Sequence, residues 1–134
     1  MEPRARVLLV EDEPENQLVV GLILRTEGFE VIGTEEGGAA AGMARAERPD
    51  VILLDVMMPE VNGFQVLERL RADPETASIP VILLTALAQR RDVELAIEAG
   101  VAGYITKPFE PEDLIRRITS VLESRSTGST GGRA

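Results

Sequence analysis

Short runs of apolar residues alternate with amphipathic segments along most of the chain. Residues 7–10, 51–54 and 81–84 are each four consecutive apolar residues, and a polar residue follows each run. Such runs are typical of strands that are buried on both faces of a parallel sheet. Shorter apolar stretches at 29–32 and 102–106 predict two further strands.

Apolar residues recur at helical spacing in the segments between these runs. The segment 35–48 contains Gly37, Gly38 and Gly42, and each interior Gly costs about 1 kcal/mol relative to Ala, so we expect this helix to be the least stable. The predicted helices begin at Pro14, at Glu35, after Asn62, near Gln89 and at Pro111, and the first four end at Gly28, at Arg48, before the loop 73–80 and near Ala99.

Four of these helices have apolar positions that define their pattern most clearly. The helix after Asn62 is expected to pack through its apolar residues, and the helix near 89–99 is expected to turn three apolar residues inward. The positions are Leu18, Val19, Leu22 and Ile23 in the first helix; Phe64, Leu67 and Leu70 in the third; Val93, Ala96 and Ile97 in the fourth; and Leu114, Ile115, Ile118, Val121 and Leu122 in the last.

Five strands alternating strictly with helices predict an α/β fold, a doubly wound parallel sheet with helices on both faces. A single domain over residues 1–124 accounts for this pattern. Residues 125–134 are rich in Ser, Thr and Gly, and we expect them to be a disordered tail or the stub of a linker.

The amino-acid composition excludes several kinds of functional site. The 134 residues include no Cys and no His, which excludes a disulfide framework, a thiolate metal site, a Cys nucleophile and a phosphohistidine carried by this chain. A net charge of −9 argues against direct nucleic-acid binding. No apolar run is long enough for a membrane span or a signal peptide, so we expect a cytoplasmic protein. Lys107 is the single lysine among 14 basic residues.

Polar side chains follow the predicted strands at their carboxyl ends, which share one edge of a parallel sheet. These residues are Glu11, Asp12, Asp55, Thr85 and Lys107. Two carboxylates 4 Å apart repel by roughly 4 kcal/mol at an effective dielectric near 20, so such a cluster favours a cation. Oxygen ligands suit Mg²⁺, for which Mn²⁺ could substitute.

A carboxylate such as Asp55, held beside a divalent ion and a lysine, can attack phosphorus and become an aspartyl phosphate. Lys107 would offset the charge on the phosphoryl oxygens, and the Thr85 hydroxyl could donate to one of them. Taken singly, each residue also fits an ordinary surface or helix-capping role. Their joint placement on one edge is what favours a phosphorylation switch.

Four pieces of the chain, LLVEDE, ILLDVMMPEVNGF, VILLTA and GYITKPF, occur in this order. With them the chain resembles receiver domains of two-component response regulators, of the single-domain chemotaxis type, from about Arg6 to Ser124. The resemblance implies a flavodoxin-like sheet of order 2-1-3-4-5. It also implies phosphorylation of Asp55 by a histidine kinase, a phosphotransfer protein or a small acyl phosphate, and a cis peptide bond between Lys107 and Pro108.

The resemblance further implies a ligand set for Mg²⁺: Asp12, Asp55 and the backbone carbonyl of Met57, with Glu11 acting through water. Tyr104 would be the switch aromatic, turning inward as Thr85 moves, although it also fits an ordinary half-buried strand residue. The output face would be the fourth helix, fifth strand and fifth helix, which suits an output protein or a homodimer. Its charged residues are Arg90, Arg91, Asp92, Glu94, Arg116 and Arg117.

Two positions beside the site depart from the chemotaxis type. Met57 and Leu87 are apolar and cannot hold a hydrolytic water by a hydrogen bond. Our hypothesis is therefore that the phosphorylated state decays slowly, and a half-life of seconds would contradict it.

Two other classes of function share part of this pattern. A small Mg²⁺-dependent phosphatase or phosphotransferase uses similar residues but needs a substrate pocket, and no insertion here is long enough to build one. A degenerate receiver used as a scaffold, or a flavodoxin-like nucleotide binder, would not need the intact acidic pair, Thr and Lys; the EDEPEN loop also lacks a phosphate cradle. We expect a signalling domain rather than an enzyme, either stand-alone or excised from a larger protein.

Overall fold

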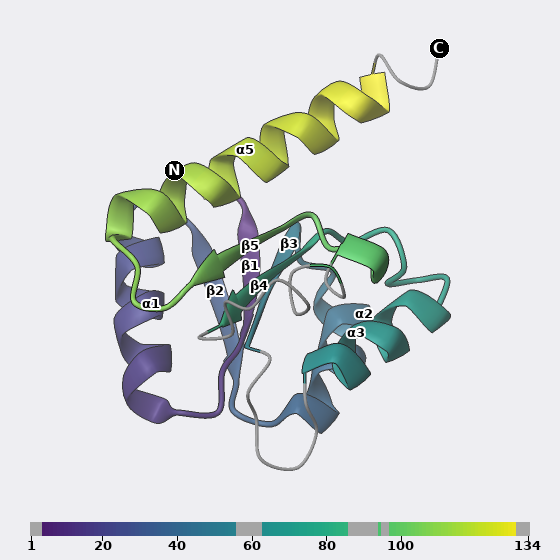
Figure 1. The fold of residues 1–134 in the computed structure, drawn as a ribbon, viewed down its shortest axis with the longest axis horizontal. Helices are drawn as coiled ribbons and strands as arrows, with labels where there is room; N and C mark the ends of the chain where they lie inside the picture. The colour runs from purple at the N-terminus through teal and green to yellow at the C-terminus, as the bar shows by residue number, and fades with distance from the viewer. Residues whose placement is uncertain (1–3, 56–62, 86–93, 95–96, 131–134) are drawn as a thin grey trace.

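Five parallel strands form one sheet at the centre of the molecule. The computed structural model describes residues 4–55, 63–85, 94 and 97–130, with the backbone alone at Thr85 and 125–130 (Figure 1). The strand order is β2-β1-β3-β4-β5, which confirms the predicted doubly wound, flavodoxin-like sheet. The strands are β1 (Arg6–Val10), β2 (Glu30–Thr34), β3 (Val51–Asp55), β4 (Val81–Thr85) and β5 (Gly103–Thr106).

The register of the sheet brings the carboxyl ends of the central strands to one edge. Val10 of β1 pairs with Leu54 of β3, so Glu11 lies level with Asp55. Asp55 in turn pairs with Leu84 of β4. The sheet therefore places the residues that follow β1 and β3 side by side, as the alternation of the sequence predicts.

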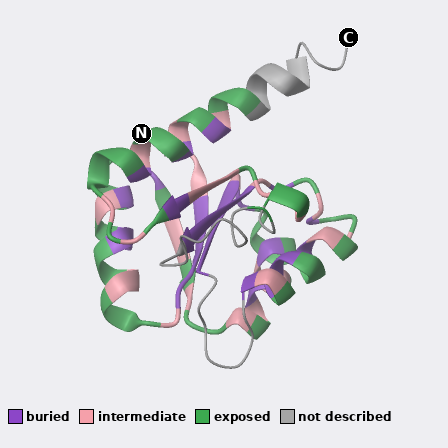
Figure 2. Ribbon diagram, viewed as in Figure 1, coloured by how far each residue is buried: buried purple, intermediate pink, exposed green. Residues whose placement is uncertain are grey.

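Helices cover both faces of the sheet. In Figure 1, α1 and α5 lie on one side and α2 and α3 on the other. Figure 2 shows buried residues along the sides of these helices that face the sheet and exposed residues on their outer sides. No helix among the described residues is long and apolar enough to cross a membrane. The helices are α1 (Pro14–Thr26), the 3₁₀ turn η1 (Gly37–Ala39), α2 (Ala40–Glu47), α3 (Gly63–Ala72) and α5 (Pro111–Thr130).

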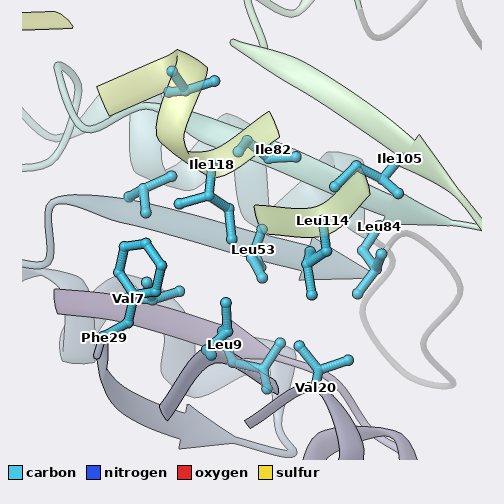
Figure 3. Close-up of a cluster of buried hydrophobic side chains, with 13 residues drawn as sticks. Val7, Leu9, Val20, Phe29, Leu53, Ile82, Leu84, Ile105, Leu114 and Ile118 are labelled. Atoms are coloured by element: carbon cyan, nitrogen blue, oxygen red, sulfur yellow. The ribbon is translucent and has the colours of Figure 1, made fainter. Parts of the chain in front are cut away.

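Alternate residues of each central strand enter different halves of the core, because successive side chains of a strand point to opposite faces. On the α1 and α5 side, Leu53 of β3 packs with Leu114 and Ile118 of α5 (Figure 3). On the α2 and α3 side, Leu54 packs with Leu67 and other buried residues. The last helix thus uses the apolar stripe predicted for it.

The first helix buries a different set of residues from those whose spacing predicts it. Val20 and Leu24 face the core at 3% and 0% exposure, whereas Leu18, Val19 and Leu22 are 69%, 55% and 64% exposed. The apolar pattern of α1 is wide enough to fit more than one rotation about the helix axis. Packing against the sheet selects one rotation and leaves part of the pattern in water.

Most of the helix predicted near 89–99 lies outside the described residues, as do Asn62 and Leu87. One expectation within it is wrong, because Ile97 is 69% exposed. Ala99 and Val101 pack against the core instead. The chain turns at Gly100, where φ is +79°, so the apolar residues around this turn reach the core in place of Ile97.

Two element boundaries differ from the sequence-based expectation. The segment 35–48 becomes helical only at Gly37, as the 3₁₀ turn η1 followed by α2. At the other end of the chain, α5 continues through Thr130, past the predicted boundary at 124, because Ser, Thr and Gly weaken a helix without interrupting its backbone hydrogen bonds. Residues 131–134 lie outside the described part, and the division into a domain and a tail stays a prediction.

Candidate functional site

Three carboxylates meet at the carboxyl edge of the sheet. Glu11 directly follows β1, Asp12 comes next, and Asp55 is the last residue of β3. Oxygen atoms of all three lie within 4.8 Å of one another. Glu11 and Asp55 are 0% and 3% exposed, while Asp12 is partly exposed. The cluster predicted from the strand ends is therefore formed, and two of its three members are removed from water.

Lys107 joins this cluster from the residue after β5. Its Nζ donates to Oε1 of Glu11 and to Oδ2 of Asp55, both at 3.0 Å. The side chain keeps 21% of its surface exposed, so the ammonium closes the site on one side while a path to water remains. The Lys107–Pro108 peptide bond is cis, as predicted. A single cation thus bridges two buried carboxylates.

The pKa values of Glu11 and Lys107 are both raised, for different physical reasons. Burial raises the pKa of Glu11 to about 7; Lys107 opposes the shift, and nearby Asp55 adds to it. Burial by itself would lower the pKa of Lys107, but its hydrogen bonds and attraction to Glu11 and Asp55 outweigh that effect and raise it. The lysine therefore stays charged at neutral pH, whereas Glu11 exchanges a proton near pH 7.

The donor set fits a hard divalent cation. Three carboxylates gathered at one point supply oxygen ligands only, which suits Mg²⁺. The part of Asp12 that is exposed leaves room for water in the coordination shell, as Mg²⁺ usually requires. The Met57 carbonyl, predicted as a further ligand, lies outside the described residues.

The structure places the two predicted switch residues on neighbouring strands. Thr85 ends β4, and its backbone is paired with Thr106 of β5; its side chain is not among the described ones. Tyr104 lies on β5, is half-buried, and packs against the core cluster that contains Leu83. β4 and β5 are parallel neighbours, so both strands end at the same edge of the sheet.

Tyr104 also borders a cavity of about 370 Å³ between β5 and α5, together with Arg116 and Arg117 of α5. Arg116 forms an ion pair of 3.0 Å with Asp113, and the Arg117 side chain lies across Gly103. Of the charged residues predicted for this face, Glu94 is described and exposed, whereas Arg90, Arg91 and Asp92 lie outside the described part.

Two residues beside the acidic cluster were missed by sequence reasoning. Nε2 of Gln17 on α1 donates to the backbone carbonyl of Glu11 at 3.3 Å. Gly33 of β2 makes room for this amide, because a Cβ there would lie 3.0 Å from Cδ of Gln17. The backbone N–H of Glu11 donates to the backbone carbonyl of Thr34 at 3.1 Å. An isolated Gly within a predicted strand signals such a close approach, and this signal could have identified Gly33.

Residues 7–119 match the family model of the response regulator receiver domain. The chain belongs to this family. Receiver domains are the phosphorylation-type switches of two-component signalling, and they interact with histidine kinases and output proteins. The resemblance seen in the sequence is therefore confirmed, and the chain has an acidic cluster whose oxygen atoms suit Mg²⁺.

Relatives of this receiver differ in what accompanies the domain. It is 40% identical over 118 residues to Protein PilH of Pseudomonas aeruginosa, covering 88% of this chain and 98% of that protein. It is 39% identical to the DNA-binding response regulator MtrA of Mycolicibacterium smegmatis, covering 89% of this chain but 51% of MtrA. The chain thus spans nearly all of PilH and about half of the DNA-binding relative.

Solved structures agree with the receiver fold. Chemotaxis protein CheY4 of Vibrio cholerae superposes with a TM-score of 0.83 at 31% identity, covering 87% of this chain and 98% of CheY4. The receiver domain of a sensor histidine kinase from Pseudomonas aeruginosa gives 0.82 at 34% identity, covering 89% of this chain and 98% of that one. The latter structure has a magnesium ion coordinated in its active site cleft.

Proposed function

We propose that Asp55 accepts a phosphoryl group and that this modification switches the domain between two signalling states. The observation that carries the proposal is the bridge from Lys107 Nζ to Asp55 and Glu11 at 3.0 Å, within a cluster of three carboxylates. Asp55 is the member of the cluster that ends the central strand and lies beside the lysine. This position at the end of the central strand supports Asp55 as the nucleophile.

In the transfer step, an Oδ atom of Asp55 forms a bond to phosphorus while the bond from phosphorus to the donor breaks. The donor is a phosphohistidine of a kinase or phosphotransfer protein, or a small acyl phosphate, and it leaves with the bonding electron pair. Lys107 then exchanges a carboxylate oxygen for a phosphoryl oxygen as its hydrogen-bond acceptor, which stabilises the charge that develops in transfer. Hydrolysis of the aspartyl phosphate by water restores Asp55 and releases phosphate.

Asp12 and Asp55 would hold Mg²⁺ directly, Glu11 would act through water, and the Met57 carbonyl would complete the protein ligands. The ion offsets charge on the phosphoryl oxygens when it is bound. Mn²⁺ prefers similar oxygen ligands and would substitute for it. Because Glu11 accepts a hydrogen bond from Lys107, the lysine would help to hold this carboxylate in place beside the ion.

Output is proposed to run through Thr85 and Tyr104. Phosphorylation adds about −1.5 to −2 charges at Asp55, which favours a position of the Thr85 hydroxyl close to the phosphoryl group. Tyr104 would then turn inward and change the face formed by the fourth helix, β5 and α5. That face would bind an output protein or a second phosphorylated copy.

Intact-mass spectrometry after incubation with acetyl phosphate and Mg²⁺ tests the proposal. The wild-type chain should gain one phosphoryl group, and Asp55→Asn should gain none, because the amide is not a nucleophile. Excess chelator should abolish the gain. Asp113→Asn is the matched control: it removes an exposed carboxylate that pairs with Arg116 on α5, and it should react like the wild type.

Phosphorylation of Asp55→Asn, or phosphorylation that survives the chelator, would contradict the proposed site. Following the modified protein after removal of the donor also tests the slow decay expected from Met57 and Leu87. Folding of each variant is checked by far-UV circular dichroism.

A further inference from the structure

The outer side of α1 is the most apolar exposed surface in the described part of the chain. Leu18, Val19 and Leu22 are 69%, 55% and 64% exposed, and among described residues only Ile97 is a comparably exposed large apolar residue. Fully burying such a side chain is worth about 1.5–3 kcal/mol, so three of them on one helix create a strong tendency to be covered.

Charged residues bracket this apolar surface at both ends of the helix. Glu15, Leu18, Leu22 and Arg25 follow one another at spacings of three, four and three residues, which places them along one side of α1. Glu15 lies in the first turn and Arg25 in the last turn. Within the described part of the structure, neither of these two forms an ion pair with another residue. This side of α1, which we call the α1 stripe (Glu15, Leu18, Leu22 and Arg25), is therefore acidic at its N-terminal end, apolar in the middle and basic at its C-terminal end.

A groove continues the apolar surface towards α5. It has a volume of about 520 Å³ and lies between Leu22 and Ile23 of α1 and Ile115 of α5. Glu27 and Arg116 are among the residues at its polar margin. The apolar area available to a partner is thus wider than one helix ridge.

We propose that this surface pairs with the same surface of a second copy, with the two α1 helices antiparallel. Such a two-fold contact brings position 20 of one helix level with position 20 of the other. Because Glu15 and Arg25 lie equally far from that position, each Glu15 then faces the partner's Arg25. Leu18 and Leu22 are also equally far from it, so each Leu18 faces the partner's Leu22. The α1 stripe is complementary to itself in this one orientation.

The pairing goes beyond the proposed phosphorylation switch, since it uses neither Asp55 nor the β5 and α5 face. One helix face and a groove bury less than the roughly 800 Å² per partner of a typical stable interface. The dimer is therefore weak, and it dissociates in the micromolar to millimolar range.

Sedimentation velocity of the full, unphosphorylated chain tests this pairing from about 10 μM to about 1 mM, the range expected for an interface of this size. The weight-average sedimentation coefficient should rise with concentration to that of a dimer. Glu15→Arg and Arg25→Glu should each weaken dimerisation about tenfold, because each creates two like-charge contacts per dimer. The double variant should restore it.

Charge reversal separates local pairing from general repulsion between acidic molecules. Glu15→Arg brings the net charge of −9 closer to zero, so general repulsion would fall and association would rise. The antiparallel contact gives the opposite result. A parallel pairing would place like residues opposite each other in the wild type and in every variant, so neither single reversal would weaken it through these contacts. That result would overturn the proposed orientation.

Leu22→Glu should abolish dimerisation, and Ile97→Glu is its matched control, because both side chains are exposed and apolar at 64% and 69%. A chain that stays monomeric throughout the range, or a dimer insensitive to Leu22→Glu, would overturn the proposal. If the chain is monomeric and Leu22→Glu instead slows phosphorylation by a phosphotransfer protein but not by acetyl phosphate, the surface serves that partner and the proposal fails.

Discussion

Lys107 and Asp55 are joined by a hydrogen bond of 3.0 Å although 52 positions separate them in the chain. The same Nζ atom bonds Glu11, so one ammonium holds two carboxylates that would otherwise repel each other. These are two of the three carboxylates that fit a divalent cation. A metal ion bound there would act on the same negative charge as the lysine, which is a permanent counter-ion, whereas the ion would be exchangeable.

Lys107→Met should separate these two effects. The variant loses the donor to the phosphoryl oxygens, and we expect phosphorylation by acetyl phosphate to slow by about 10²–10³-fold, as for other lost transition-state donors. Its Mg²⁺ affinity should rise, because no ammonium competes for Glu11 and Asp55. Time-resolved intact-mass spectrometry measures the first quantity and isothermal titration calorimetry the second.

Arg116→Met is the control for this variant, since it removes a cation from an exposed pair with Asp113 on α5. Both quantities should stay at wild-type values in it. Weaker Mg²⁺ binding in Lys107→Met would mean that the lysine organises the ligands more than it competes with the ion.

The raised pKa of Glu11 predicts a pH-dependent stability in protein freed of metal by a chelator. Glu11 titrates at about 7 in the folded chain and at 4.5 in the unfolded chain, so the folded state binds the proton more tightly. The free energy of unfolding should therefore fall as pH rises from 4.5 to 7 and level off above. The raised pKa of Lys107 adds no slope here, because a lysine loses its stabilising charge only at alkaline pH.

The Glu11→Gln variant has no ionisable group at this position, so its free energy of unfolding should lack this pH dependence. The difference in unfolding free energy between the variant and the wild type should grow by about 3 kcal/mol from pH 5 to pH 8, in favour of the variant. Urea unfolding followed by circular dichroism measures it, which suits a chain without tryptophan. A difference that stays constant with pH would show that Glu11 ionises near its usual pKa.

Sequence periodicity was sufficient to predict a parallel sheet with the polar strand ends at one edge, whereas the order of the strands was implied by the family resemblance. The runs that end at Glu11 and Asp55 are apolar on both faces, which only a central parallel strand requires, and strand order then forces their carboxyl ends together. The pairing of Lys107 with both carboxylates could be expected from the same geometry, because a lysine after β5 meets that edge too.

The rotation of α1 about its axis and the side-chain contacts of Gln17 could not be predicted from sequence periodicity. A period of 3.6 fits either Leu18, Val19 and Leu22 or Val20 and Leu24 as the buried side of α1, and only packing against the sheet decides between them. The support of the acidic turn by Gln17 depends on the distance between α1 and β2, which no residue pattern specifies.

Gln17 and Gly33 should affect Mg²⁺ binding although neither is a ligand. Gln17→Ala removes the donor to the Glu11 carbonyl and loosens the turn that carries Glu11 and Asp12. Gly33→Ala displaces the same amide, since its Cβ would lie 3.0 Å from Cδ of Gln17. Each should weaken Mg²⁺ binding by about tenfold, as for residues that orient metal ligands. Isothermal titration calorimetry measures the effect.

The double variant shows whether the two residues act through one contact. With the Gln17 amide gone, Gly33→Ala has nothing to displace, so the double variant should bind Mg²⁺ no more weakly than Gln17→Ala. Thr26→Ala is the control on the same helix, because its hydroxyl bonds only Leu22 within α1. Additive losses would show that Gly33 acts on the site by another route.

Arg71 of α3 forms hydrogen bonds with two connecting segments, the loop before β4 and the turn before β5. Its Nη1 donates to the carbonyls of Ala77 and Ile79 at 3.0 Å each, and its Nη2 donates to Gly100 at 3.2 Å. Burial of the guanidinium lowers the pKa of Arg71, but an arginine remains charged at every physiological pH. The side chain thus fixes the loop before β4 to the turn that precedes β5.

Arg71→Met keeps most of the apolar stem and removes all three donors, leaving the carbonyl of buried Ile79 without this partner. We expect the free energy of unfolding to fall by about 2–3 kcal/mol, the usual loss when a charged donor leaves partly buried acceptors. Arg69→Met, an exposed neighbour on α3, should change it by less than about 0.5 kcal/mol. Arg71→Lys should recover only part of the loss, because one ammonium cannot span carbonyls on both segments. Equal effects of Arg71→Met and Arg69→Met in urea unfolding would mean that these hydrogen bonds contribute little to stability.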